Sequence, residues 1–278
     1  MTFITRFAPS PTGPLHLGHA YSAIISHDMA RRKGGKFYLR IEDLDQSRSK
    51  KKWENKIFDD LDWLGLSWDE PVVRQSEQID RYQNILIKYK KELGLFECNC
   101  SRRDIKNALT APHENEKLSG PDGIIYPGTC RGNMFLSKLN FENVLRMHIN
   151  LSENKSFSFS ELGQRKGEIL FSSEEFSKTV GDVVLWRRGY PAYHLACVID
   201  DSEQKITHVV RGLDLFDATK IHTVLNSYLG FQKPFYYHHK LICDEHGRRL
   251  AKRHDSKSIC KYRQEGFKAS DVRALLGL

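Results

Sequence analysis

Two histidines, His16 and His19, stand three residues apart just after a loop rich in proline and glycine. β-Forming residues precede this loop, from Thr2 to Ala8, and helical periodicity follows it, so the loop leads from a strand into a helix. The first turn of a helix offers unpaired backbone N–H groups and the positive end of the helix dipole, which together favour phosphate. The spacing therefore predicts a polyphosphate site in which both histidines donate hydrogen bonds, while Gly18 lets a flat group such as an adenine approach the backbone.

The elements that would position these histidines alternate between strand and helix patterns. Apolar residues recur at helical spacing from Leu17 to Met29, and Phe37, Leu39 and Ile41 alternate with polar residues as in a strand. The further elements expected are helices over 53–64, 76–93 and 221–229, strands near 144–150, 157–162, 166–171, 193–199, 206–211 and 240–243, and a last helix from 270. This order is typical of a parallel α/β sheet, interrupted by an irregular insertion at 107–128.

The overall composition limits the classes of protein that are possible. The chain has 278 residues, of which 40% are hydrophobic, so it can bury a substantial core and is not a disordered tail. No run approaches the ~18–20 apolar residues of a membrane span, and the first residues lack the pattern of a signal peptide. We therefore expect a soluble, cytoplasmic protein with no membrane partner. The net charge of +8 fits a nucleic-acid-binding protein or an ordinary basic enzyme equally well.

Five ordered motifs resemble those of one enzyme family. The segment from Arg6 to His19 resembles the HIGH signature of class I aminoacyl-tRNA synthetases, in the form found in glutamyl-tRNA synthetases. The other four motifs are Phe37-Tyr-Leu-Arg-Ile-Glu-Asp-Leu-Asp-Gln-Ser-Arg48, Leu64-Gly-Leu-Ser-Trp-Asp-Glu70, Val209-Val-Arg-Gly-Leu-Asp-Leu215 and Gly247-Arg-Arg-Leu-Ala-Lys-Arg253. The last stands where the family has its KMSKS loop. The chain is therefore identified as a member of this family, which implies a Rossmann-like, parallel-sheet α/β catalytic domain.

The resemblance also implies how the chain is divided. The first half of the catalytic domain would occupy residues 1–95 and the second half residues 190–230, with an acceptor-binding-like, zinc-bearing insertion at 96–189. Residues 231–278 would form the KMSKS-like loop and a short stem-contact-like segment. Only 25 residues follow Arg253, too few for an anticodon-binding domain. In this respect the chain resembles the glutamyl-queuosine tRNA(Asp) synthetases, a truncated branch of the family.

That resemblance implies a two-step reaction. L-Glutamate would be activated with ATP to glutamyl-adenylate, with release of diphosphate, and then transferred to the queuosine at the wobble position of tRNA(Asp). Negative charge grows on the phosphate oxygens during activation, so positive charge and hydrogen bonds would accelerate it. The residues that the motifs place in the ATP site are His16, Gly18, His19 and Lys252, with the two histidines and the lysine as catalytic groups and Mg²⁺ on the triphosphate. Arg253 stands where the family's loop has a serine, which is expected to alter loop closure.

Glutamate carries two carboxylates and one ammonium group, so its pocket needs two cations and one anion. The positions that match the family's glutamate-binding residues are Arg6, Ala8, Ser10, Glu42, Tyr193 and Arg211. The arginines would bind the carboxylates, the glutamate side chain would pair with the ammonium group, and the tyrosine would hydrogen-bond a carboxylate. The alanine would contribute its backbone and the serine its hydroxyl. Cys197 stands where the family often has a polar residue, so one contact with the substrate side chain would be missing or replaced.

Three of the six cysteines form a cluster, with Cys98 and Cys100 two residues apart and Cys130 four residues after Tyr126. Three thiolates suit a tetrahedral Zn²⁺ ion, and a closed structural site needs a fourth ligand. By resemblance the four ligands are Cys98, Cys100, Tyr126 and Cys130, and His113 is a rival for the fourth position. A phenol can serve because the metal lowers its pKa. The alternative is three unrelated buried thiols beside a core tyrosine.

Three other functions compete with glutamate transfer to queuosine. A truncated glutamyl-tRNA synthetase would charge a tRNA 3′ end, a small-molecule nucleotidyltransferase would share the His-x-Gly-His motif, and a non-catalytic RNA-binding relic would have lost activity. The glutamate-binding set and Lys252 argue against the nucleotidyltransferase, and the retained histidines, lysine and arginines argue against the relic. The expected partners are therefore L-glutamate, ATP and queuosine-bearing tRNA(Asp). Since the pattern shows no obvious exposed apolar helix, we expect a monomer.

Overall fold

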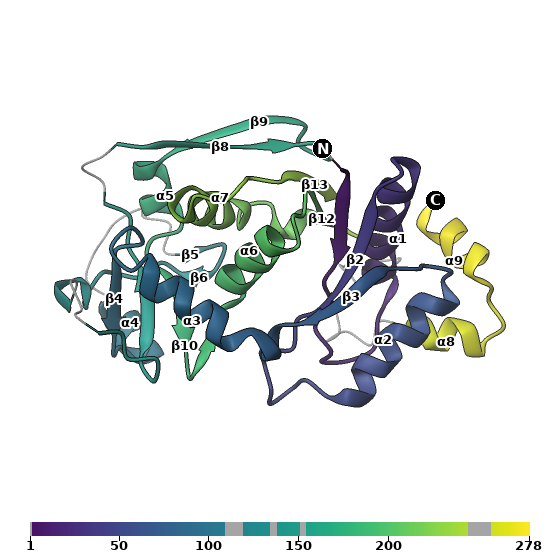
Figure 1. Cartoon of the computed structure of the whole chain (residues 1–278), viewed down its shortest axis with the longest axis horizontal. Coiled ribbons are helices and arrows are strands. Elements are labelled where there is room, and N and C mark those ends of the chain that lie inside the picture. Colours follow the sequence, from purple (N-terminus) through teal and green to yellow (C-terminus); the bar gives the residue numbers. More distant parts are fainter. Residues whose placement is uncertain (1, 109–118, 134–137, 151–153, 244–256) are drawn as a thin grey trace.

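Parallel strands form the central layer of the molecule (Figure 1). The computed structural model describes residues 2–108, 119–133, 138–150, 154–243 and 257–278. One group of strands is ordered β1-β2-β3 and a second β12-β13-β8-β9, in which β9 is antiparallel to β8. Their bounds are β1 Ile4–Phe7, β2 Lys36–Ile41, β3 Asp69–Arg74, β8 Ser156–Glu161, β9 Gly167–Ser172, β12 His208–Gly212 and β13 Phe235–His239. The groups meet where the Thr207 backbone N–H donates to the Ile4 carbonyl at 3.0 Å, so β1 and β12 lie side by side.

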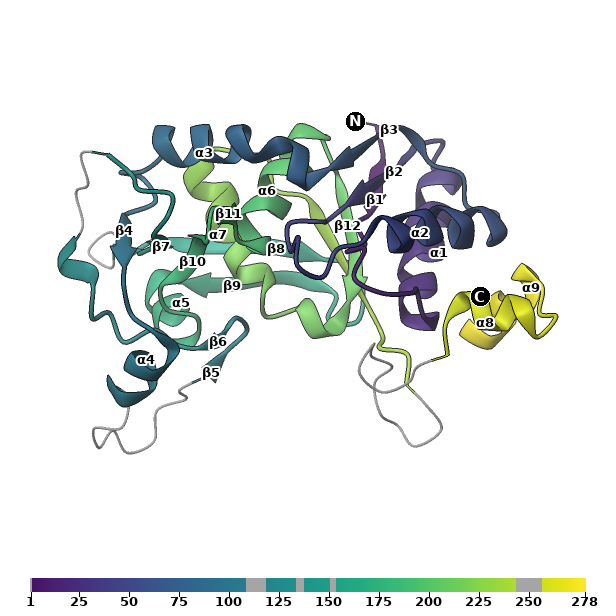
Figure 2. The same cartoon turned by 90° about the horizontal axis from the view of Figure 1, so that it is seen from below.

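Helices connect and flank these strands (Figures 1 and 2). Their bounds are α1 Leu17–Arg32, α2 Lys51–Trp63, α3 Ile79–Lys88, α6 Tyr193–Glu203, α7 Thr219–Leu229, α8 Ile259–Gln264 and α9 Ala269–Leu276. Parallel neighbours such as β1 and β2 need a crossover, and α1 supplies it. This order confirms the predicted α/β fold class. Among the described helices, none is long and apolar enough to cross a membrane.

A second sheet, formed by the middle of the chain, has the strand order β11-β10-β7-β4 and is antiparallel. Its strands are β4 Leu95–Cys98, β7 Val144–Met147, β10 Val183–Arg187 and β11 Tyr190–Pro191, accompanied by α4 Arg102–Ala108, α5 Ser173–Thr179 and the hairpin β5 Ser119–Gly120 and β6 Gly123–Ile124. Strands β8 and β9 belong to the same stretch of sequence but extend the parallel layer. There the Leu162 backbone N–H donates to the Tyr236 carbonyl at 2.7 Å. This pairing brings Glu161, at the end of β8, beside β13.

Most predicted elements are present, three differ in type or bounds, and the structure adds elements that were not predicted. The strand expected at 193–199 is wrong: these residues begin α6, and a short apolar run buried on every side has the same pattern in a strand and a helix. The strand expected at 240–243 lies earlier, in β13, where neighbouring aromatic and histidine residues hide any alternation. Helix α3 ends at Lys88, before the predicted 93. The sequence pattern does not reveal β3, whose polar, proline-containing start suits an edge strand.

Two large buried clusters hold these elements together. One lies among α1, α2, β1 and β2, and the C-terminal helices α8 and α9 add Ile259, Val272 and Leu276 to it. An ion pair between Arg273 Nη1 and Asp28 Oδ2 at 2.7 Å joins α9 to α1. The other cluster joins α6 and α7 to the antiparallel sheet and to β8, β9, β12 and β13. The C-terminal helices are thus part of the packing around α1.

We predict that Ile259→Ala destabilises the chain by about 2–4 kcal/mol, since it leaves a cavity where a side chain with 0% exposure packed against α1 and α2. Ile87→Ala is the matched control, because Ile87 is 51% exposed, and it should change the free energy of unfolding by less than about 0.5 kcal/mol. Urea denaturation measures both. Equal effects of the two substitutions would show that α8 is not packed into this core.

Candidate active site

The N-terminus of α1 is organised by the two predicted histidines. His16 is the N-cap residue: its Nδ1 accepts a hydrogen bond from the Gly18 backbone N–H at 3.1 Å. His19 Nδ1 accepts from the His16 backbone N–H at 3.2 Å, and the two ring centroids are 3.8 Å apart. Because Nδ1 accepts in both rings, each neutral imidazole carries its proton on Nε2. The Nε2–H groups are therefore the donors that a phosphate would meet.

Gly18 is required here for a reason that the sequence did not suggest. A Cβ atom at this position would lie 3.0 Å from His16 Cε1 and 3.1 Å from His16 Nδ1. Such contacts are tighter than ordinary van der Waals packing, so a side chain would push the His16 ring away from the backbone N–H that it caps. Glycine thus preserves the cap geometry itself, in addition to leaving the backbone open to a flat group.

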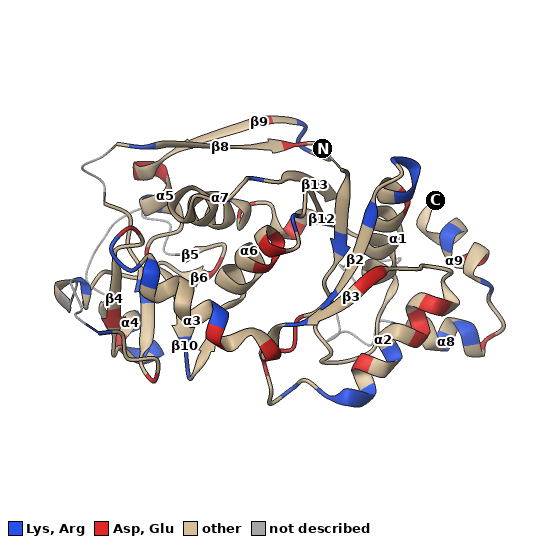
Figure 3. Ribbon diagram, viewed as in Figure 1, with Lys and Arg blue, Asp and Glu red and all other residues tan. Residues whose placement is uncertain are grey.

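A buried group of charges lies at the carboxyl ends of β1 and β2, against the acidic end of α6 (Figure 3). We call Arg6, Arg40, Glu42 and Asp201 the Asp201 cluster. Asp201 Oδ1 accepts from Arg6 Nε at 2.9 Å and from Arg40 Nη1 at 2.8 Å, and Oδ2 accepts from Arg6 Nη2 at 3.2 Å. Burial alone would raise the pKa of Asp201, but the two guanidinium groups lower it to about 2. Arg6 is therefore held through its Nε–Nη2 edge.

Glu42 lies directly after β2 and links this cluster to the Pro/Gly loop. Its backbone N–H donates to the Pro9 carbonyl at 3.0 Å, so the half-buried Ala8 and Ser10 lie at the end of the strand. Its carboxylate accepts from Arg40 Nη2 at 3.3 Å. Burial raises the pKa of Glu42, and Arg40 only partly opposes the shift. A further positive charge beside Glu42 would stabilise its ionised form.

Helix α6 presents Tyr193, Cys197 and Asp201 on one face, because they are spaced four residues apart. Cys197 is buried, and its Sγ accepts from Nη2 of Arg6 at 3.7 Å and of Arg40 at 3.6 Å. Burial raises the pKa of this thiol to about 12, so it is uncharged. The departure from the family pattern at position 197 thus produces a contact with the two arginines. Tyr193, by contrast, remains 38% exposed.

Arg211, at the carboxyl end of β12, is buried in a separate set of hydrogen bonds. Its Nε donates to His238 Nε2 at 3.2 Å, its Nη2 donates to Thr219 Oγ1 at 2.7 Å, and its Nη1 lies 3.4 Å from His222 Nδ1. The Tyr193 ring lies beside His222, with centroids 5.8 Å apart. The Tyr193 phenol is within electrostatic reach of Arg211 and of the Asp201 cluster. The structure therefore brings the predicted glutamate-binding residues together at one end of the parallel layer.

Described residues on either side of the segment that contains the predicted Lys252 lie beside α1. Before it, His239 at the end of β13 donates from Nδ1 to a backbone carbonyl at 2.8 Å and accepts at Nε2 from the Ser22 hydroxyl of α1 at 2.6 Å. After it, Ser258 pairs with His16 in an isolated antiparallel bridge. His239 and Ser258, which flank the segment in the sequence, are thus both held against the first turns of α1. The predicted residues Lys252, Arg253 and His113 lie outside the described residues.

The cysteine cluster lies at the end of β4, away from this site. Sγ atoms of Cys98, Cys100 and Cys130 all lie within 4.8 Å of one another, with 3.5 Å between Cys100 and Cys130. Tyr126 Oη is 3.4 Å from Cys98 Sγ and from Cys100 Sγ, and it accepts from the Cys130 backbone N–H at 2.9 Å. A guanidinium, that of Arg146, lies 4.1 Å from the centroid of the Tyr126 ring. Three sulfurs and one oxygen therefore lie close together at this place.

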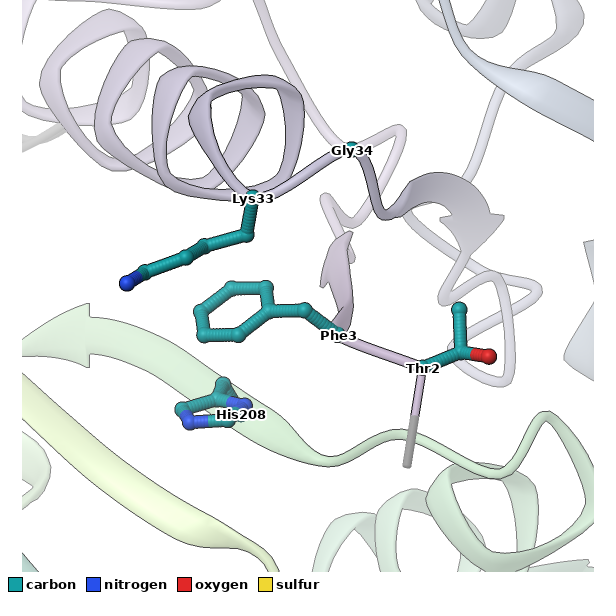
Figure 4. Close-up of a pocket in the computed structure, with 5 residues that line it drawn as sticks. All are labelled: Thr2, Phe3, Lys33, Gly34 and His208. Carbon is teal, nitrogen blue, oxygen red and sulfur yellow. The ribbon is translucent and has the colours of Figure 1, made fainter.

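A pocket at the opposite edge of the layer is lined by Thr2, Phe3, Lys33, Gly34 and His208 (Figure 4). It lies where β1 and β12 begin, and the Phe3 ring stacks on His208 with centroids 3.8 Å apart. In open α/β sheets, ligands bind outside the carboxyl ends of the strands. The predicted site residues lie at that other edge, so this pocket is separate from them.

Four buried residues of the site are not predicted by the sequence analysis: Arg40, Asp201, His222 and His238. Arg40 alternates with apolar residues in β2, and this pattern is typical of a solvent-facing position. Asp201 follows the apolar run that resembles a strand. Its spacing of four and eight residues from Cys197 and Tyr193 is the signal that could have placed it on the same helix face. The two histidines carry no comparable local signal.

The fold and these residues define the catalytic domain of a class I tRNA synthetase. The family described as "tRNA synthetases class I (E and Q), catalytic domain" matches residues 2–278, and the chain belongs to this family. The family identified from the sequence motifs is thereby confirmed. More particularly, the chain is 49% identical to the "Glutamyl-Q tRNA(Asp) synthetase" of Rhodobacter capsulatus, and the alignment covers 99% of this chain and 100% of that protein.

Longer relatives match the same region. The "Glutamate–tRNA ligase" of a Hydrogenobaculum species is 37% identical over 95% of this chain, which spans 55% of that protein. A crystal structure of a glutamate tRNA ligase from Elizabethkingia meningosepticum in complex with its amino acid has a TM-score of 0.70 at 27% identity, covering 96% of this chain and 54% of the ligase. The chain thus spans about half the length of these ligases.

We predict that Asp201→Asn lowers the free energy of unfolding by about 3–5 kcal/mol at pH 7, because two buried guanidinium groups lose their shared carboxylate. The pKa of Asp201 falls from 3.8 in the unfolded chain to about 2 in the folded protein. Its stabilising effect is therefore full above about pH 4 and is lost as the pH falls toward 2. Urea denaturation from pH 7 to pH 2 should show the two proteins converging at low pH.

The exposed Asp217 offers the control, since Asp217→Asn should change stability by less than about 0.5 kcal/mol. A difference between wild type and Asp201→Asn that stays constant down to pH 2 would contradict the ion-pair account.

Proposed function

We propose that this chain activates L-glutamate with ATP to glutamyl-adenylate and transfers the glutamyl group to the queuosine at the wobble position of tRNA(Asp). One observation carries the proposal. Two imidazole rings at the start of α1, cationic side chains on β1 and β12 and an acid after β2 lie at the carboxyl ends of neighbouring parallel strands. The name of the relative that is 49% identical supports the choice of acceptor.

The amino acid would be bound by charge complementarity. Its ammonium group would pair with Glu42 and favour the ionised carboxylate that burial disfavours. Its carboxylates would meet Nη1 of Arg6 and the second N–H of Arg211 Nη1. Bonds within the protein occupy Nε and Nη2 of both guanidinium groups, and His222 Nδ1 faces the other N–H of Arg211 Nη1. Tyr193 would add a hydrogen bond, and the Ala8 backbone and the hydroxyl of Ser10 would close the pocket at the loop.

Activation is the attack of one glutamate carboxylate oxygen on the α-phosphorus of ATP, with diphosphate as the leaving group. Negative charge grows on the phosphate oxygens, so the Nε2–H groups of His16 and His19 and the ammonium group of Lys252 would stabilise the transition state. Mg²⁺ bound with ATP would supply further positive charge at the triphosphate. In the second step a hydroxyl of the queuosine cyclopentene diol would attack the adenylate carbonyl carbon and AMP would leave.

We further assign the cysteine cluster to a structural Zn²⁺ ion held by Cys98, Cys100, Tyr126 and Cys130. In a tetrahedral site with Zn–S near 2.3 Å and Zn–O near 2.0 Å, neighbouring ligand atoms are about 3.5–3.8 Å apart. The distances of 3.4 Å and 3.5 Å within the cluster fit this geometry. Burial raises the pKa of the Tyr126 phenol, so ionised oxygen at this position needs the charge of a metal.

The remaining parts of the proposal concern organisation and partners. The catalytic halves at 1–95 and 190–230, the insertion at 96–189 and the segment 231–278 would act as one cytoplasmic monomer. Basic residues at the start of α2 and on α8 would offer positive charge to RNA phosphates (Figure 3).

Zinc binding is predicted to give one metal ion per chain, measured by elemental analysis of protein purified without added metal. Cys130→Ser should lower the content well below one ion, and Tyr126→Phe should weaken retention against a chelator by about tenfold or more, since an oxygen ligand is lost. The exposed Cys243 lies outside the cluster, so Cys243→Ser should keep one ion. Loss of zinc in His113→Ala together with full retention in Tyr126→Phe would show that His113, and not Tyr126, is the fourth ligand.

Glutamate-dependent exchange of diphosphate into ATP is predicted to occur without tRNA. Lys252→Ala should lower kcat for exchange by about 10²-fold with a smaller change in KM for glutamate, because this group acts mainly in the transition state. The exposed Lys240, just before the loop, is the matched control, and Lys240→Ala should leave the rate near that of wild type.

The acceptor is tested in the same preparation with labelled glutamate. Transfer should require queuosine in tRNA(Asp) and should be absent from the same tRNA carrying guanosine. Transfer to tRNA(Glu) alone would favour a truncated ligase that charges a 3′ end, and the absence of any exchange would reject the synthetase activity.

A further inference from the structure

The arginines buried in the described part of the chain are compensated in two different ways. Arg6 and Arg40 share the carboxylate of Asp201. Among the described residues, no carboxylate bonds directly to Arg211. Its hydrogen-bond partners are all uncharged acceptors: His238 Nε2, His222 Nδ1, Thr219 Oγ1 and the Leu215 carbonyl. Because Arg211 is only 5% exposed, its charge is buried without a directly paired anion.

The guanidinium fixes the protonation of both histidines that face it. Arginine has five N–H donors and no acceptor, so a ring nitrogen that faces it carries no proton. His222 therefore has its proton on Nε2, where it donates to His194 Nδ1 at 3.1 Å. His238 has its proton on Nδ1, where it donates to Glu161 Oε2 at 2.5 Å. Both rings are neutral, and each is held in one tautomer by a second partner.

These residues come from different elements, which makes the arrangement rigid. Glu161 ends β8, His238 lies on β13, Arg211 on β12, His222 on α7 and His194 on α6. Every one of these side chains is less than a tenth exposed. Burial, reinforced by the Arg211 charge, holds the pKa of His222 well below its usual range. Burial also lowers the pKa of His238, although Glu161 opposes the shift.

We propose that His222 and His238 are positioning residues that orient Arg211 and keep any carboxylate of the protein from bonding to it directly, so that a carboxylate of the substrate amino acid becomes its counter-ion. This inference rests on the proposed function. A carboxylate in place of either imidazole would pair with Arg211 and remove the charge that recruits substrate. A side chain without an acceptor would leave buried N–H groups unbonded. A neutral imidazole of fixed tautomer avoids both effects.

The variants His222→Asn and His222→Asp carry side chains of the same shape that differ in charge. Comparing them therefore separates the effect of charge from the effect of shape. The amide oxygen of the asparagine variant can accept from Arg211 Nη1 as Nδ1 does, whereas the aspartate variant adds a negative charge at the same place. In glutamate-dependent ATP–diphosphate exchange by the full chain, we expect KM for glutamate to be at least about tenfold higher in His222→Asp than in His222→Asn. KM for ATP should be similar in both. Thermal unfolding of both variants is the control that checks whether they are folded.

Equal glutamate KM values in the two folded variants would overturn the proposal, as would a parallel rise in KM for ATP. A second measurement does not depend on activity. Imidazole ¹⁵N NMR of the wild-type chain should show protonated Nε2 in His222 and protonated Nδ1 in His238. The opposite tautomers, or a doubly protonated ring at pH 7, would overturn the proposal even if exchange is observed. Correct tautomers with no exchange would instead reject the proposed function alone.

Discussion

A buried positive charge has to be compensated, and this constraint organises the site end of the parallel layer. Taking a guanidinium group out of water costs several kcal/mol unless hydrogen bonds and an opposite charge replace its hydration. Asp201 meets the requirement for Arg6 and Arg40 within the protein. Arg211 has its hydrogen bonds satisfied by neutral groups but lacks a directly bonded carboxylate among the described residues. On our proposal, a carboxylate of the substrate amino acid supplies the anion that Arg211 lacks.

The start of α1 carries the proposed phosphate-binding residues and lies beside the buried charges. His16 and His19 cap their own helix by accepting hydrogen bonds at Nδ1. The Nε2–H groups of both rings therefore donate to other partners. Ser258 reaches the same turn from the C-terminal segment. Packing of α8 and α9 against α1 therefore holds Ser258 beside the turn that carries His16 and His19.

Much of the fold and part of the site could be predicted because their signals are local in sequence. The Pro/Gly loop before His16, the period of β2 and the glycine after α7 are all readable within about ten residues. The clearest error, the strand expected at 193–199, had a consequence for the site. Read as a helix, the same residues put Tyr193, Cys197 and Asp201 on one face, and the partner of Arg6 becomes visible.

The remaining residues could not be predicted because their roles arise only from long-range contacts. Arg40 meets Asp201 across 161 positions of sequence, and Glu161 meets His238 across 77. No pattern within a strand or helix records such a partner. The motifs identify the residues that would touch substrate, whereas the groups that hold those residues in place emerge from the packing of β2, β8, β13, α6 and α7.

The central claim is that these differently compensated arginines form a pocket for an amino acid with a side-chain carboxylate. Isothermal titration calorimetry of the chain with L-glutamate and with L-glutamine tests it most directly, since the two differ in one charge. The account predicts saturable binding of one glutamate per chain without ATP, and binding of glutamine weaker by at least about tenfold, or 1.4 kcal/mol. Equal affinities, or no glutamate binding, would contradict it.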